Sequence, residues 1–211
     1  AANFVTEAVE SALVQPETGE VILVEDASPD NSLSVCRQLA EKHEKVRLLR
    51  HADGRNHGAA ATRNLGIQSA RCELISFLDA DDYYLPGRFA QAVVIFAEMP
   101  DADGVYEAVR NVWETPQMEH WWRENRLDQS LTTVQERLAP EHLLRGLTCR
   151  GKGHMHTNGI TVRKHLFEKT GPFDVELRMC QDAAMWIKMA AVGRLYPGRL
   201  DEPVATRRVH G

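Results

Sequence analysis

The 211-residue sequence is poor in cysteine and has no CxxC pair. Its four cysteines are scattered along the chain, at Cys36, Cys72, Cys149 and Cys180. Disulfide frameworks and structural zinc sites need several cysteines at short or regular spacings, so neither is expected here. We therefore expect reduced thiols and a cytoplasmic location.

The sequence also lacks long apolar runs and an excess of basic residues. No run approaches the roughly 18–20 apolar residues that cross a bilayer, and the first residues, with Glu7 and Glu10, do not resemble a secretory signal. The formal net charge of −5 provides no basic surface, so no nucleic-acid partner is expected. Internal repeats and low-complexity tracts are absent too, and we expect residues 1–211 to form one domain.

The first half of the sequence alternates between short apolar runs and helical patterns. The apolar runs predict strands at residues 21–24, 46–49 and 74–78. The helical patterns predict helices at residues 1–14, from a cap at Ser28 onwards, at 58–70 and at 86–99. Such an alternation with short links indicates an α/β fold in which most strands of the sheet are parallel.

The second half of the sequence is less regular. Its patterns predict strands at residues 105–112, 160–162 and 203–209, and helices at 138–144, 164–170 and 182–192. Gly171 suits a left-handed cap at the end of helix 164–170. Residues 113–135 and 148–157 show little periodicity, and we interpret most of them as loops.

Three carboxylates, Asp79, Asp81 and Asp82, directly follow the apolar run 74–78. The carboxyl ends of strands in open α/β sheets are where ligands bind. Carboxylates this close together repel one another unless a cation neutralises them, and hard oxygen ligands suit Mg²⁺ or Mn²⁺. The alternative interpretation is an acidic turn that caps a helix with Pro86 in its first turn.

Two further acids lie at predicted element ends. Asp26 follows strand 21–24, so parallel strands would bring it to the same crevice as Asp79, where it could accept hydrogen bonds from a base or ribose. The alternative for Asp26 is an Asx turn or helix cap before Pro29. Asp182 begins a predicted helix, where it could act as a catalytic base, although an acid in a first turn also favours the helix dipole.

The histidines provide weaker signals. His210 ends the last predicted strand and could bind a metal ion or a phosphate, but a lone histidine is more often an ordinary surface residue. His154 and His156 alternate around Met155, yet no third ligand is apparent, so a zinc site is not expected there.

Six motifs occur in a fixed order along the chain. They are Val24–Ser32 (VEDASPDNS), NHG at 56–58 with ATRNLGI at 61–67, FLDADD at 77–82, EKTGPFD at 168–174, Gln181-Asp182 with Trp186, and RRVH at 207–210. The ordered set resembles the family 2 glycosyltransferases of the GT-A fold. FLDADD resembles the DxD pair of that family, and EKTGPFD resembles its GxFD segment. Gln181-Asp182 with Trp186 resembles its ED…W helix, and RRVH resembles its closing YRxH.

The resemblance implies a three-layer α/β/α fold with a mixed, mostly parallel central sheet. It also implies a nucleotide-binding half at residues 1–100 and an acceptor-binding half at 101–211. The family's first strand should precede Ala1 and is missing from this sequence, so we expect a part of a longer chain. Gln181 stands where the family usually has Glu, which weakens the motif around Asp182.

The same resemblance implies a role for each site residue. The nucleotide would contact Asp26, Asn56, Gly58, Arg63, Asp79 and Asp81. Asp81 and His210 would hold Mn²⁺ or Mg²⁺ against the diphosphate, and Asp182 would deprotonate the acceptor hydroxyl.

The implied activity is inverting, metal-dependent transfer of a sugar from a nucleotide sugar, most simply a UDP-sugar. The acceptor would be a carbohydrate or a lipid-linked molecule in polysaccharide or glycoconjugate synthesis, with peripheral membrane contact in the lipid-linked case. Two alternatives stay open, a non-catalytic nucleotide-sugar binding module and a sugar nucleotidyltransferase. The latter requires a Gly-rich phosphate loop that the sequence does not show.

Overall fold

The computed structural model describes residues 2–124, 130–149 and 153–210. Residues 125–129 and 150–152, which belong to the two predicted loops, lie outside the described residues. The first half contains α1 (Val5–Leu13), β1 (Val21–Glu25), α2 (Ser32–Lys42), β2 (Val46–Arg50), α3 (Gly58–Ser69), β3 (Leu74–Ser76), β4 (Tyr83–Tyr84) and α4 (Ala90–Glu98).

The second half contains shorter strands and more connecting chain. Its elements are β5 (Gly104–Tyr106), β6 (Val109–Trp113), α5 (Pro116–Glu124), β7 (Leu131–Thr132), α6 (Pro140–Thr148), the 3-10 turn η1 (Thr157–Gly159), β8 (Ile160–Arg163), α7 (Leu166–Thr170), α8 (Gln181–Val192), β9 (Leu195–Pro197) and β10 (Ala205–Val209).

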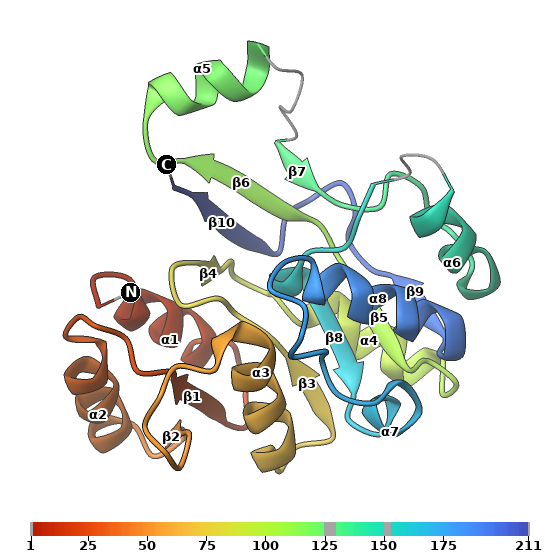
Figure 1. Ribbon diagram of the computed structural model, residues 1–211. Coiled ribbons are helices and arrows are strands. Elements are labelled where there is room, and N and C mark those ends of the chain that lie inside the picture. Colours follow the sequence, from red (N-terminus) through yellow and green to blue (C-terminus); the bar gives the residue numbers. More distant parts are fainter. Residues whose placement is uncertain (1, 125–129, 150–152, 211) are drawn as a thin grey trace.

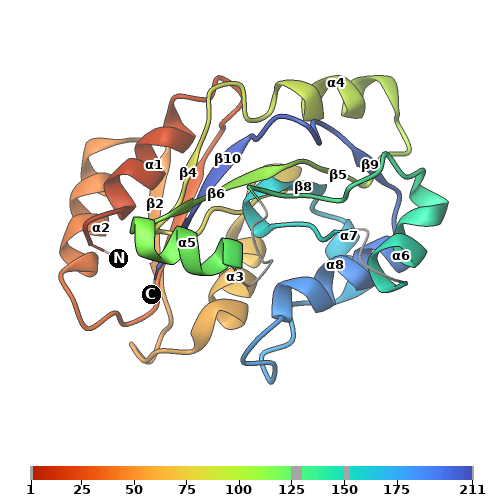
Figure 2. The ribbon, with the colours of Figure 1, turned by 90° about the horizontal axis from the view of Figure 1, so that it is seen from above.

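The strands form three sheets with mixed pairing, in the orders β1-β2, β4-β10-β6-β7 and β3-β8-β5-β9. The two longest pairings, β1 with β2 and β6 with β10, are parallel and each aligns five residues. Strand β8 is antiparallel to both of its neighbours, β3 and β5. Helices lie on both sides of the strands, with α4 on one side and α3 and α8 on the other (Figures 1 and 2). The predicted α/β class and the layered arrangement are confirmed.

The largest apolar core lies between the sheet β3-β8-β5-β9 and helix α8 (Figure 1). Helix α8 contributes Met185, Trp186 and Met189, whose spacing of three to four residues places them on one face of the helix. Strand β8 contributes Ile160 and Val162, both completely buried. The alternating residues of β8 and the residues on one face of α8 thus pack in the same core.

The predicted helix start at Ser28 is wrong. Helix α2 begins at Ser32, and Asp30 Oδ1 accepts the Ser32 backbone N–H at 3.0 Å. Ser28 instead donates its backbone N–H to the buried Glu25 carboxylate at 2.7 Å. Ala27, just before Ser28, adopts a left-handed backbone (φ 54°). These contacts hold residues 26–31 as a loop.

Further element boundaries differ from the predictions, including strand 74–78, which ends at Ser76, and strand 203–209, which begins at Ala205. The predicted strand 105–112 is two strands, β5 and β6, which belong to different sheets. Glu107 lies between them, and its side chain forms a buried ion pair with Arg88. The predicted helix 86–99 begins only at Ala90, and β4 precedes it. The region 113–135, interpreted mostly as loop, contains helix α5.

None of the helices within the described ranges combines the length and the apolar character that crossing a bilayer requires.

The C-terminal ends of the helices agree with the predictions more closely than their starts do. Gly171 ends α7 with φ 72°, as its left-handed cap predicted.

Candidate functional site

Asp26 lies just beyond β1 and faces the N-terminus of α3. Its two carboxylate oxygens accept the backbone N–H groups of His57 and Gly58, at 2.8 and 2.7 Å. Asn56 donates its side-chain amide to the Asp26 carbonyl at 2.6 Å. Gly58 has φ 83°, a conformation that favours glycine. The structure therefore brings Asp26, Asn56 and Gly58 together, and Asp26 contacts α3 rather than capping a helix at Pro29.

Arg63 on α3 links this corner to Asp79. Its Nη2 donates to Asp79 Oδ1 at 2.8 Å, and its guanidinium lies 5.7 Å from the centre of the Phe173 ring. Arg63 Nη1 is buried and has no hydrogen-bond partner among the described residues. A buried guanidinium nitrogen without a partner is costly, so this nitrogen suits a ligand oxygen.

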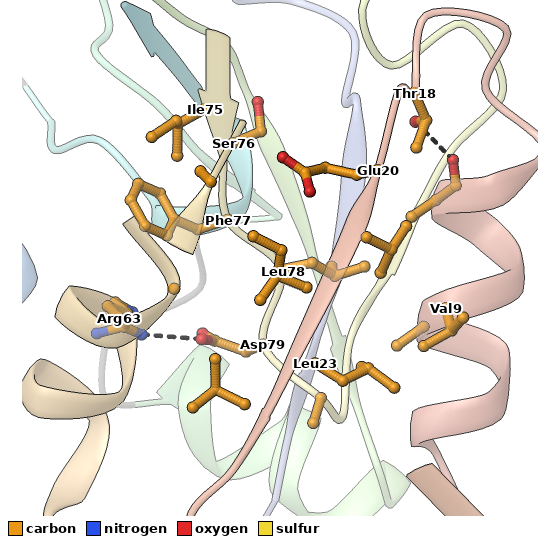
Figure 3. A pocket seen from close by; sticks show the side chains of 18 of the residues that line it. Val9, Thr18, Glu20, Leu23, Arg63, Ile75, Ser76, Phe77, Leu78 and Asp79 are labelled. Carbon is orange, nitrogen blue, oxygen red and sulfur yellow. Dashed lines mark hydrogen bonds and ion pairs between the residues drawn. The ribbon is translucent and has the colours of Figure 1, made fainter. Parts of the chain in front are cut away.

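A cavity of about 720 Å³ separates β1 from β3, which do not pair with each other in the described part of the chain. Its walls are mainly apolar and include Leu23 of β1 and Leu78, which follows β3 (Figure 3). Asp26, Arg63 and Asp79 also line it. Figure 3 shows Arg63 and Asp79 joined at one end of this cavity. The predicted common crevice for Asp26 and Asp79 is thus present.

Asp81 pairs with the last strand rather than with α3. Its Oδ2 lies 3.2 Å from His210 Nε2, and His210 Nδ1 lies 3.5 Å from Glu114 Oε2. Over residues 2–124, 130–149 and 153–210, no group of three or more histidine, cysteine or acidic side chains is arranged to hold a metal ion. The structure therefore brings Asp81 and His210 together, and the described residues add no further acidic, histidine or cysteine ligand in a metal-binding arrangement.

Asp82 is almost completely buried, with 2% of its surface exposed. Asn158 Nδ2 donates to Asp82 Oδ2 at 2.6 Å, and the Arg208 backbone N–H donates to Asp82 Oδ1 at 2.7 Å. Burial raises the pKa of Asp82 to about 6 against the lowering effect of these two hydrogen bonds, and the nearby acids of the turn raise it further. The interpretation of Asp82 as the cap of the next helix is wrong, because that helix begins eight residues later.

Asp182 lies in the first turn of α8, as predicted, and its Oδ1 accepts the Ala183 backbone N–H at 2.8 Å. The preceding Cys180 has a left-handed backbone (φ 59°), which sets the start of the helix. His154 and His156 are close enough to Asp182 to feel its charge. Burial lowers the pKa of His156 to about 4, so this imidazole is neutral at pH 7.

The sequence patterns missed Asn158 and the role of His156. His156 Nδ1 accepts the Asn158 backbone N–H at 3.2 Å, which leaves the proton on Nε2. The His-x-His spacing was compared only with zinc ligands, and no zinc site was expected. The hydrogen-bond partner of His156 is Asn158, two residues further along the chain. Asn158 precedes a strand and carries no pattern of its own, so no sequence signal identified it.

Comparisons with known proteins agree with this arrangement. Residues 1–170 match the family described as "Glycosyl transferase family 2". The succinoglycan biosynthesis protein ExoU of Rhizobium meliloti is 41% identical over 91 residues, which are 43% of this chain and 26% of that protein. The matched segment therefore spans about a quarter of the length of this relative.

Two solved structures have a similar fold. The S. aureus TarS 1-349 structure in complex with UDP superposes with a TM-score of 0.68 at 19% identity, covering 98% of this chain and 57% of that one. Mannosyltransferase PcManGT from Pyrobaculum calidifontis, in complex with GDP-Man and Mn²⁺, gives a TM-score of 0.64 at 21% identity and covers 98% and 53%. Both likenesses concern the fold. Because the family match extends over residues 1–170, the chain belongs to glycosyl transferase family 2.

Proposed function

We propose that this chain forms the nucleotide-binding and catalytic part of an inverting, metal-dependent glycosyltransferase. The observation that carries the proposal is the position of Asp26, Arg63 and Asp79 around one cavity. Family membership supports the reaction class, and residues 1–100 and 101–211 are the proposed nucleotide-binding and acceptor-binding halves.

The nucleotide would lie along the rim formed by Asp26 and α3. Two backbone N–H groups already fix the direction of the Asp26 carboxylate, which can accept hydrogen bonds from a base or ribose. The N-terminus of α3 at Gly58 favours negative charge. Arg63 Nη1 can donate to a nucleotide oxygen, and Asp79 would contact the ribose. Asn56 supports Asp26 from behind.

Asp81 and His210 fit a divalent cation. Asp81 Oδ2 and His210 Nε2 are 3.2 Å apart, so both side chains could hold one divalent cation together with oxygens of the substrate. A carboxylate with an imidazole suits Mn²⁺ better than the harder Mg²⁺. The bound ion would neutralise the charge that develops on the departing nucleoside diphosphate.

Asp182 would act as the general base. Its carboxylate would take the proton of the acceptor hydroxyl while that oxygen attacks the anomeric carbon and the bond to the diphosphate breaks. Attack opposite the leaving group inverts the anomeric configuration. The Ala183 N–H fixes one carboxylate oxygen, and the left-handed backbone at Cys180 sets the position of the helix that carries it.

A UDP-sugar is the proposed donor, because a similar fold binds UDP in TarS. A second similar fold, PcManGT, is in complex with GDP-Man and Mn²⁺, which supports the proposed metal. The relative named for succinoglycan biosynthesis supports an acceptor in polysaccharide synthesis, either a carbohydrate or a lipid-linked sugar at a membrane surface.

Calorimetry on the intact protein with UDP and with GDP, each with and without Mn²⁺, tests the nucleotide and the metal. Release of UDP from UDP-sugars, with and without candidate acceptors, tests transfer. Asp182→Asn should retain nucleotide binding and lose at least about 100-fold in transfer, as expected for a general base. Normal turnover in this variant would exclude Asp182 as the base, and binding without turnover in the wild type would indicate a binding module.

A further inference from the structure

Asn158 lies behind the acidic turn formed by residues 79–82 and is completely buried. Its side-chain Oδ1 accepts the Asp79 backbone N–H at 3.1 Å. Its Nδ2 donates to Asp82 Oδ2 at 2.6 Å. One amide therefore ties the first residue of the turn to the last.

Asn158 is itself held firmly in place. Its carbonyl oxygen accepts a hydrogen bond from Arg88 Nε at 3.0 Å, and its backbone N–H donates to His156 Nδ1 at 3.2 Å. Arg88 forms an ion pair with Glu107 at 2.9 Å in which neither side chain is exposed. Because buried groups with satisfied hydrogen bonds have few alternative arrangements, the Asn158 amide has a fixed position.

The opposite side of the acidic turn is fixed by β10. The Arg208 backbone N–H donates to Asp82 Oδ1 at 2.7 Å, and Arg208 Nη1 donates to the Asp81 carbonyl at 2.5 Å. His210 follows two residues later and pairs with the Asp81 carboxylate. The turn is therefore held between Asn158 and β10.

We propose that Asn158 is a positioning residue that directs the carboxylates of Asp79 and Asp81 towards the cation and the nucleotide. It acts through the backbone of Asp79 and the side chain of Asp82, and it does not itself contact the ligand. An amide is required because it must accept one hydrogen bond and donate the other. An aspartate at this position would turn a second carboxylate towards Asp82. The inference rests on the proposed function.

The test compares Asn158→Asp with the double variant Asn158→Asp plus Asp82→Asn in the intact protein. The single variant places two carboxylates face to face, whereas the double variant restores one donor and one acceptor with the positions exchanged. Calorimetry with UDP in the presence of Mn²⁺ should show an affinity reduced about 10- to 100-fold in the single variant, as expected when a residue supporting a metal ligand is lost. The double variant should recover most of that loss, and UDP binding without metal should change little.

A matched control is Gln15→Glu. Gln15 is also a buried amide with 2% exposure. Its side chain donates to the carbonyls of Ser11 and Leu85 and accepts the backbone N–H of Arg88, so it contacts neither the acidic turn nor the Arg88 guanidinium that binds Asn158. This variant should lower the thermal midpoint and leave Mn²⁺-dependent UDP affinity unchanged. A comparable loss of UDP affinity in the control would assign the Asn158 effect to general destabilisation and overturn the inference.

The outcomes separate the inference from the proposed function. If the wild type binds neither UDP nor GDP with Mn²⁺, the proposed function is wrong. If the wild type binds and a folded Asn158→Asp variant binds equally well, the positioning role is wrong. Should the single variant fail to fold, the double variant decides, because a folded double variant without a response to Mn²⁺ contradicts the proposal.

Discussion

The sheets on the two sides of the cavity differ in how tightly they are packed. In β5 and β8, the side chains of Val105, Ile160 and Val162 are completely buried. In β1, the residues from Val21 to Val24 are only half-buried, and Glu25 alone is fully enclosed. The reason is that helices and further strands surround β5 and β8, whereas the cavity adjoins β1 along its length.

The candidate site draws residues from both sides of this contrast. Asp79 follows β3 of the tightly packed sheet and is tied to Asn158, whereas Asp26 follows β1. Close-packed interiors resist displacement, and cavities do not. We therefore expect the end of the candidate site at Asp79 to have a more rigid support than the β1 side, which adjoins the cavity along its length. The following predictions test this difference.

The largest effect is expected from Glu107→Gln. This change leaves Arg88 charged, buried and without its anionic partner, which costs about 3–5 kcal/mol. The corresponding change on the β1 side is Arg47→Gln, which removes a partly exposed pair with Glu20 at 2.8 Å and should cost less than about 1 kcal/mol. Urea unfolding of both variants measures the difference. Equal losses in the free energy of unfolding would show that the two sides do not differ in how strongly their ion pairs stabilise the fold.

The Arg88–Glu107 pair also shows where sequence reasoning reaches its limit. Apolar runs and helical spacing predicted β1, α3, α8 and β10, because these patterns depend on neighbouring residues. The break at Glu107 depends on a partner 19 residues away, and the apolar residues around Glu107 gave no sign of it.

The candidate site was predictable to a similar extent. Asp26 directly follows β1 and Asp182 lies in the first turn of α8, as predicted, whereas β3 ends at Ser76 and Asp79 and Asp81 lie in the turn between β3 and β4. Asn158 contacts Asp82 across 76 residues, and nothing in its local sequence indicates that contact. Ordered motifs identified the candidate site residues, whereas a buried supporting residue such as Asn158 is identified only by the contacts of the folded chain.

An intermediate effect is expected when a methyl group is added to a glycine on each side. At Gly104 in β5, a Cβ atom would lie 2.5 Å from Leu195 Cδ2 and 2.9 Å from Val162 Cγ1, so Gly104→Ala should cost about 1–3 kcal/mol. At Gly66 in α3, the nearest atom would be Val24 Cγ2 at 3.6 Å. Gly66→Ala should instead stabilise by about 0.5–1 kcal/mol, because alanine is the better helix former.

Thermal unfolding of the two alanine variants measures both signs in one experiment. A stabilised Gly104→Ala variant would mean that the tightly packed sheet yields to an extra methyl group. A destabilised Gly66→Ala variant would mean that β1 and α3 have less room than the cavity indicates.

The smallest effect is expected from pH in the wild type, because two neighbouring groups oppose each other. The raised pKa of Asp82, about 6, means that the folded state binds its proton more tightly than the unfolded state, so this group lowers stability as the pH rises from about 4 to 6. The lowered pKa of His156, about 4, means that the unfolded state binds the proton first, so this group lowers stability as the pH falls from about 6.5 to 4. The two contributions should largely cancel between pH 4.5 and 6.

Single variants should reveal the two slopes that cancel in the wild type. Asp82→Asn removes the first contribution, so its stability should fall as the pH falls through this range. His156→Asn keeps an acceptor for the Asn158 N–H and removes the second contribution, so its stability should rise as the pH falls. Urea unfolding at several pH values without added metal measures both slopes. Parallel slopes in the two variants would show that Asp82 and His156 do not set the pH dependence of stability.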